Sequence, residues 1–168
     1  MMKTLSVLAI ASIAISLMLI GTTDSFAKPE SKNFVAPLSG NQEVPPVDTK
    51  ATGLAKFQVN KDGDEISYKL LVNMDDVTQA HIHLGPEGEN GPVVAFLFGF
   101  VAEGIDNKGI LAQGTITEDN VIPRDGFDGT LNSLINEMRS GNTYVNVHSI
   151  GTPSGEIRGQ IAEAGPSR

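Results

Sequence analysis

The sequence of 168 residues contains no cysteine and no tryptophan, and it has only three histidines. Without cysteine the chain cannot form disulfides, zinc fingers, iron–sulfur clusters, a thiol nucleophile or the His/His/Cys copper site of blue-copper proteins. The chain has 12 Lys and Arg residues and 20 Asp and Glu residues, which gives a formal net charge of −8. Because phosphate neutralisation needs clustered basic side chains, this balance argues against nucleic acid as a partner.

Long apolar runs are also scarce, since one spans residues 5–20 and no second one follows. Lys3 before this run and the segment Ser25-Phe26-Ala27 after it are typical of a secretory signal peptide. We expect cleavage after Ala27, which leaves a secreted or envelope-associated protein without a membrane span. An uncleaved N-terminal anchor is the alternative, because about 16 apolar residues approach the roughly 20 that span a bilayer.

The chain that remains after a signal peptide at residues 1–27 has the length of one domain. We expect a linker at residues 28–33, a folded domain at 34–162 and a flexible tail at 163–168. A domain of this size buries enough surface to be stable without disulfides.

Short segments that alternate apolar and polar residues, separated by turn signals, predict an all-β fold. The expected strands are residues 34–38, 53–59, 66–72, 79–84, 93–100, 110–117, 144–148 and 156–161. Together with 18 Gly and 9 Pro residues, they indicate an antiparallel, Greek-key-like β-sandwich or barrel of about eight strands.

The segments between these strands predict turns, loops and one helix. Residues 60–64 are of the types that favour a hairpin turn, and residues 104–109 are expected to form a loop. The two prolines within 43–47 exclude a central strand there. The continuously apolar residues 93–100 indicate a strand buried on both faces. Apolar residues at helical spacing within 131–138, with Thr130 as N-cap, predict a short amphipathic crossover helix.

The three histidines form the most informative pattern in the chain. His81 and His83 are two residues apart on an expected strand, so they project from one face with Cα atoms separated by roughly 6.6 Å. His148 lies on the polar face of another strand. If these strands are neighbours, the three imidazoles form a nitrogen site suited to copper or zinc, whereas the alternative is a set of surface or hydrogen-bonding histidines. A histidine pKa near 6.5 predicts that metal affinity weakens below that pH.

Several blocks of the sequence together resemble the chordin-type (CHRD) domain. They are LSGNQEVPPV at residues 38–47, AHIHLGP at 80–86, NGPVV at 90–94, GNTYVNVH at 141–148 and PSGEIRGQI at 153–161. The resemblance implies an extracytoplasmic β-sandwich module that occurs alone in microbes and in repeats in the animal secreted protein chordin. Ser149 stands where family members often carry Thr.

The arrangement is also distantly similar to Cu/Zn superoxide dismutases, Greek-key sandwiches in which an H-x-H strand and a later histidine bind copper. His81, His83 and His148 would match the copper ligands, and Arg158 would match an arginine that guides the anion. The chain lacks the bridging histidine, the zinc ligands and the disulfide of those enzymes. Fold-level analogy does not transfer activity, so an enzymatic role has little support from the sequence.

Two functions remain open from the sequence alone. The first is an exported module that binds one copper or zinc ion for metal handling or for minor redox or hydrolytic chemistry. Its accessory residues are Glu156 as a general base beside His148, and Arg158, although these two side chains are more simply interpreted as an exposed ion pair. The second is a non-enzymatic adhesion module that binds an extracellular or cell-surface protein through loops 40–51 and 85–92, with structural histidines.

Overall fold

The computed structural model describes residues 32–165, so the expected signal peptide and most of the expected linker lie outside the described residues. The chain forms eight strands: β1 (Asn33–Ser39), β2 (Thr52–Val59), β3 (Ile66–Leu84), β4 (Val93–Phe98), β5 (Ile105–Ile116), β6 (Thr143–Ser149), β7 (Ile157–Gln160) and β8 (Ala162–Glu163). Its helices are the short 3₁₀ turns η1 (Gly40–Gln42) and η2 (Glu118–Asn120) and the α-helix α1 (Leu131–Arg139). The expected all-β class is confirmed.

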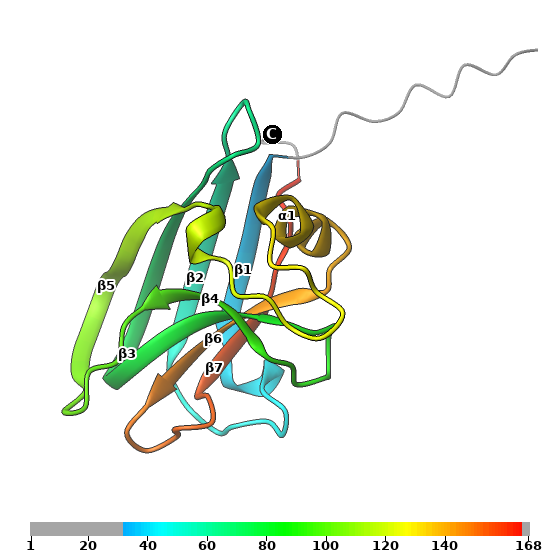
Figure 1. The fold of residues 1–168 in the computed structure, drawn as a ribbon. Coiled ribbons are helices and arrows are strands. Elements are labelled where there is room, and N and C mark those ends of the chain that lie inside the picture. The colour runs from blue at the N-terminus through cyan, green and yellow to red at the C-terminus, as the bar shows by residue number, and fades with distance from the viewer. Residues whose placement is uncertain (1–31, 166–168) are drawn as a thin grey trace, which may run out of the picture.

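The sheet is antiparallel and closes on itself (Figure 1). Neighbouring strands follow the order β2-β1-β7-β6-β3, and β3 also pairs with β2, which completes a barrel. Strands β4 and β5 pair with β3 outside this ring, and β8 pairs with β1. The last pairing, Phe34 with Glu163 and Val35 with Ala162, extends the sheet beyond residue 162, where we expected the folded domain to end.

Strand β3 is long and bent, and its two halves pair with different strands. Its first half pairs with β2 from Ile66 to Asn73, and its second half pairs with β6 from Val77 to Leu84. Between them the register shifts, and Asp76 adopts a left-handed backbone with φ 53°. The expected division of this segment into strands at 66–72 and 79–84 was wrong, because a bulge turns an extended chain without needing Gly or Pro.

Two other local expectations were also wrong. Phe96 and Phe100 are 53% and 69% exposed, so the apolar segment 93–100 is not buried on both faces. It forms an edge strand, whose outer positions face solvent. Strand β5 begins at Ile105, within the expected loop, because pairing with β3 extends it.

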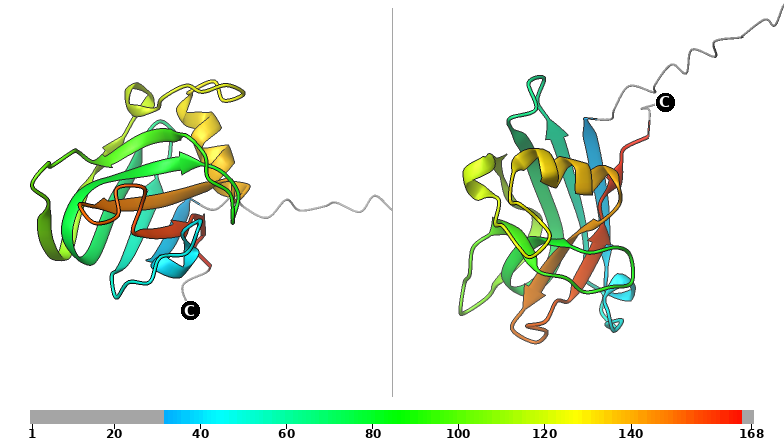
Figure 2. Two further views of the ribbon diagram at one scale, coloured as in Figure 1. Left: turned by 90° about the horizontal axis from the view of Figure 1, so that it is seen from below. Right: turned by 45° about the vertical axis from the view of Figure 1, so that its right-hand side comes forward.

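The helix and the hairpin agree with the sequence patterns. The Thr130 side chain accepts a hydrogen bond from the Ser133 N–H at the start of α1, and Leu131, Leu134, Ile135 and Met138 are buried. Figure 2 shows α1 beside the barrel, away from the turn between β6 and β7. At the hairpin, Asn60 Oδ1 accepts hydrogen bonds from the Gly63 and Asp64 N–H groups. Within residues 32–165, no helix is long and apolar enough to cross a membrane.

Closure of the barrel brings β7 so near β1 that only glycine fits at position 159. A Cβ there would collide with the Pro37 carbonyl oxygen. Gly159→Ala is therefore expected to lower the free energy of unfolding by about 1–3 kcal/mol through overpacking, measured by urea denaturation. Gly99→Ala is the matched control, because a Cβ at that position meets open space. Equal stability of the two variants would contradict this account of barrel closure.

Candidate metal centre

Antiparallel pairing of β3 with β6 brings the three histidines to one face of the sheet. In the register, Gln79 lies opposite His148, His81 opposite Asn146, and His83 opposite Tyr144. Because alternate residues of a strand share a face, all six side chains lie on the same side. His148 is therefore the diagonal neighbour of His81, a separation that long or aromatic side chains bridge.

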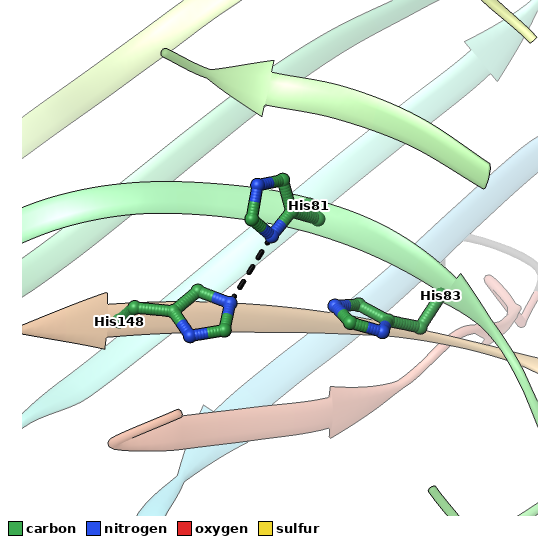
Figure 3. A group of neighbouring side chains, drawn as sticks. All are labelled: His81, His83 and His148. Carbon is green, nitrogen blue, oxygen red and sulfur yellow. Dashed lines mark hydrogen bonds between the residues drawn. The ribbon is translucent and has the colours of Figure 1, made fainter. Parts of the chain in front are cut away.

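The three rings point toward a common centre (Figure 3). His81 Nδ1 lies 3.1 Å from His148 Nε2. One ring nitrogen from each of the three histidines can be chosen so that all lie within 4.8 Å of one another. The predicted convergence of His81, His83 and His148 is confirmed as geometry. In a tetrahedral zinc site with Zn–N bonds of about 2.0–2.1 Å, ligand nitrogens lie roughly 3.3 Å apart, which is close to the 3.1 Å between His81 Nδ1 and His148 Nε2.

Backbone carbonyl groups fix the orientation of two rings. His83 Nδ1 lies 2.9 Å from the Gly91 carbonyl oxygen, and His148 Nδ1 lies 2.9 Å from the Pro153 carbonyl oxygen. A carbonyl oxygen only accepts hydrogen bonds, so each Nδ1 carries the proton and each Nε2 keeps its lone pair. This is the second-shell arrangement that orients imidazole ligands in metal sites.

Two imidazole nitrogens are buried without a partner within the described residues. They are His81 Nε2 and His83 Nε2. A buried polar group without a hydrogen bond costs about 1–3 kcal/mol, so native proteins rarely leave one without a water, an ion or a ligand. At His83 this pattern fits a metal ion, which would take the Nε2 lone pair of the neutral imidazole directly.

Burial also keeps the histidines neutral. Desolvation by burial lowers the pKa of His81 and of His83 to about 4, with a further contribution from the neighbouring imidazoles. Burial lowers the pKa of His148 as well. Protons are therefore expected to compete for the His81 and His83 rings at a lower pH than the ordinary histidine pKa of 6.5 predicts.

The polar face that carries the histidines is covered rather than exposed. Tyr144 stacks on His83 with ring centroids 4.9 Å apart, and the Arg158 guanidinium lies 3.5 Å from the Tyr144 ring centroid. Loops 40–47 and 85–92 meet over this region, where Asn90 donates a hydrogen bond to the Val44 carbonyl oxygen.

The structure gives the two accessory residues roles different from those expected. Arg158 is only 1% exposed and donates hydrogen bonds to Asn90 Oδ1 and to the Pro86 carbonyl oxygen, so the interpretation as an exposed ion pair with Glu156 was wrong. Glu156 accepts a hydrogen bond of 2.6 Å from Thr49. Of the described residues, the group that could hold a metal comprises the three histidines and does not include Glu156.

Glu43 and Asn146 also lie at this face, although no sequence pattern singled them out. Glu43 is 5% exposed, and its Oε2 accepts a hydrogen bond of 3.1 Å from Asn146 Nδ2. Desolvation by burial raises the pKa of Glu43 to about 7, although Asn146 and Arg158 oppose this rise. Glu43 lies in a proline-containing loop, where no periodicity reveals which side chains turn inward. Its place within the block at residues 38–47 was the one available signal.

The partly exposed ring of Phe96 covers one side of the histidine cluster. Phe96 on β4 packs edge-to-face against His81 with centroids 4.6 Å apart, although 53% of its surface is exposed. Access to the rings from solvent is therefore bounded by an apolar side chain on an edge strand.

Comparison with known proteins supports the resemblance seen in the sequence. A family model described as CHRD domain matches residues 34–161. No curated protein and no solved structure gives a significant match. The match covers the barrel, the two loops above the polar face and all three histidines.

The buried histidines make the stability of the metal-free protein depend on pH. Between about pH 6.5 and pH 4 the unfolded chain binds protons on His81 and His83 and the folded protein does not, so the unfolding free energy falls as pH falls. The lowered pKa of His148 acts in the same direction. Glu43 has the opposite effect on the unfolding free energy, since burial raises its pKa in the folded protein to about 7. The stability that Glu43 contributes in its protonated form is lost as pH rises through about 7.

With metal removed by a chelator, unfolding in urea should give a lower stability at about pH 5 than at about pH 7.5, by roughly 1 kcal/mol. The Glu43→Gln variant, which lacks the opposing group, should show a steeper loss. A wild-type stability that rises between these two pH values on acidification would contradict the assignment of neutral, buried imidazoles.

Proposed function

The chain belongs to the CHRD domain family, and from this premise we propose that its domain binds one copper or zinc ion through His81, His83 and His148. The observation that carries the proposal is the convergence of three neutral imidazoles, two of which are oriented by backbone carbonyl groups. Neutral imidazole suits both metals.

The hydrogen bonds support a particular set of ligand atoms. His83 and His148 would bind through Nε2, because their Nδ1 atoms are engaged by carbonyl oxygens. His81 would bind through Nδ1, which already lies 3.1 Å from His148 Nε2. In the metal-free protein the His81 Nδ1–H donates to that nitrogen. With a metal ion on Nδ1, the neutral His81 ring would carry this proton on Nε2 instead.

Three neutral ligands leave the ion with its full charge and a position for water or another small ligand. Hydrolytic chemistry needs a general base next to that position, and Glu156 is engaged by Thr49 instead. This favours metal handling over hydrolysis. We propose that this takes place outside the cytoplasm, since CHRD domains occur in extracellular proteins and residues 1–27 have the pattern of a signal peptide.

The untagged protein should bind one equivalent of Zn²⁺ or Cu²⁺ and unfold at a higher temperature when loaded, because a ligand that binds the native state stabilises it. Replacing any one histidine by alanine should weaken binding by about 100-fold or more, because the loss of even a second-shell partner costs 10–100-fold. Isothermal titration calorimetry and the thermal midpoint measure both effects.

Gln79→Ala is the matched control, because this residue occupies the same strand face two positions before His81. The control should bind metal like the wild type. Since the chain has only three histidines, a His81→Ala/His83→Ala/His148→Ala protein that binds metal as tightly as the wild type would refute the site.

A further inference from the structure

A single carboxyl group is buried on the polar face of the barrel. Among residues 32–165, Glu43 is the one Asp or Glu side chain that is buried. Asn146 holds its Oε2, whereas its Oε1 is buried and has no partner in the described part of the chain. Asn146 Oδ1 is also buried and has no hydrogen-bond partner among the described residues. Two buried acceptor oxygens therefore lie close together beside the sheet without a donor from the described residues.

Asn146 connects Glu43 to the histidine cluster. In the sheet register it lies between His81 on β3 and Arg158 on β7. Along β6 it lies between Tyr144 and His148 on the same face. Directly opposed residues in a sheet have Cβ atoms about 4.5–5.5 Å apart, so Asn146 lies beside the His81 ligand. Glu43 is in turn hydrogen-bonded to Asn146.

The charges on this face do not balance when a divalent ion is added. Arg158 is 1% exposed, and its guanidinium donates hydrogen bonds to neutral groups on Asn90, Pro86 and Gln160. The three histidine ligands are neutral. A second cation therefore enters a buried region that already holds one, and such charges need an anion nearby.

We propose that Glu43 supplies this anion, as the ionised carboxylate that compensates the charge of a divalent metal held by the three histidines. The inference rests on the proposed function and adds a residue that tunes its affinity without ligating the ion. When the carboxyl group is protonated, metal binding drives its proton into solvent, and Asn146 retains its hydrogen bond to the resulting carboxylate.

The groups around Glu43 are consistent with this role. Arg158 on β7, Tyr144 and His148 on β6, and His81 and His83 on β3 are the ionisable side chains of the strands beneath it. The loop opposite contributes Glu87 and Glu89, which are exposed. Because the pKa of Glu43 is raised to about 7, a nearby cation can change its ionisation within the neutral range.

The test measures Zn²⁺ affinity of the wild type and of Glu43→Gln at about pH 7.5 and about pH 5.5, by competition with a chelator. At the higher pH the variant should bind about tenfold more weakly, because it lacks the carboxylate charge. At the lower pH the two affinities should converge, since the wild-type carboxyl is then protonated and the ion must displace its proton. Glu87→Gln, which removes an exposed carboxylate of the neighbouring loop, should match the wild type at both values.

Each result has a definite meaning. A tenfold gap that persists at about pH 5.5 assigns Glu43 a structural role and overturns the proposal, as does the absence of a gap at both pH values. If Glu43→Gln does not fold, the wild type decides alone, because its Zn²⁺ affinity must fall about tenfold between the two pH values, and a flat profile overturns the proposal. Failure of the wild type to bind Zn²⁺ at either pH would instead refute the histidine site itself.

Discussion

The register between β3 and β6 is the constraint on which the rest of the site depends. It places His148 diagonally from His81 and puts Asn146 directly opposite that residue. A slip of one residue would turn every side chain of β6 to the other face, moving His148 into the apolar core. The Ile150 N–H bonds to the Asp76 carbonyl oxygen where β3 bends, which ties the end of β6 to the same bulge that redirects β3.

Burial of a polar sheet face is energetically costly, and the domain offsets this cost with hydrogen bonds from its loops. Carbonyl groups of Gly91 and Pro153 engage two histidines, and the Pro86 carbonyl and Asn90 engage Arg158. These loops therefore act as part of the site. Of the buried side-chain atoms without a partner in the described residues, those on His81, His83, Asn146 and Glu43 lie at this face, whereas Thr143 Oγ1 lies on the opposite face of β6. The grouping of the first four supports a ligand at this place.

The role expected for Arg158 from the analogy with superoxide dismutases does not fit the structure. Arg158 is buried over the Tyr144 ring and donates hydrogen bonds to Asn90 and to the Pro86 carbonyl oxygen, so its guanidinium is held by neutral groups. The ionisable group that the structure adds is Glu43, whose charge is opposite to that of the expected residue.

Sequence alone determined the β class, the cap and buried face of α1, the hairpin at residues 60–64 and the shared face of His81 and His83, because each depends on neighbours within a few positions. Only the tertiary structure decided that β3 is one bent strand, that Phe96 faces solvent and that Glu43 turns inward. Strand pairing and loop placement arise from contacts between residues far apart in the chain, which local periodicity does not encode. The closeness of His148 to His81 belongs to this second group, since residues 67 positions apart meet only through the sheet register.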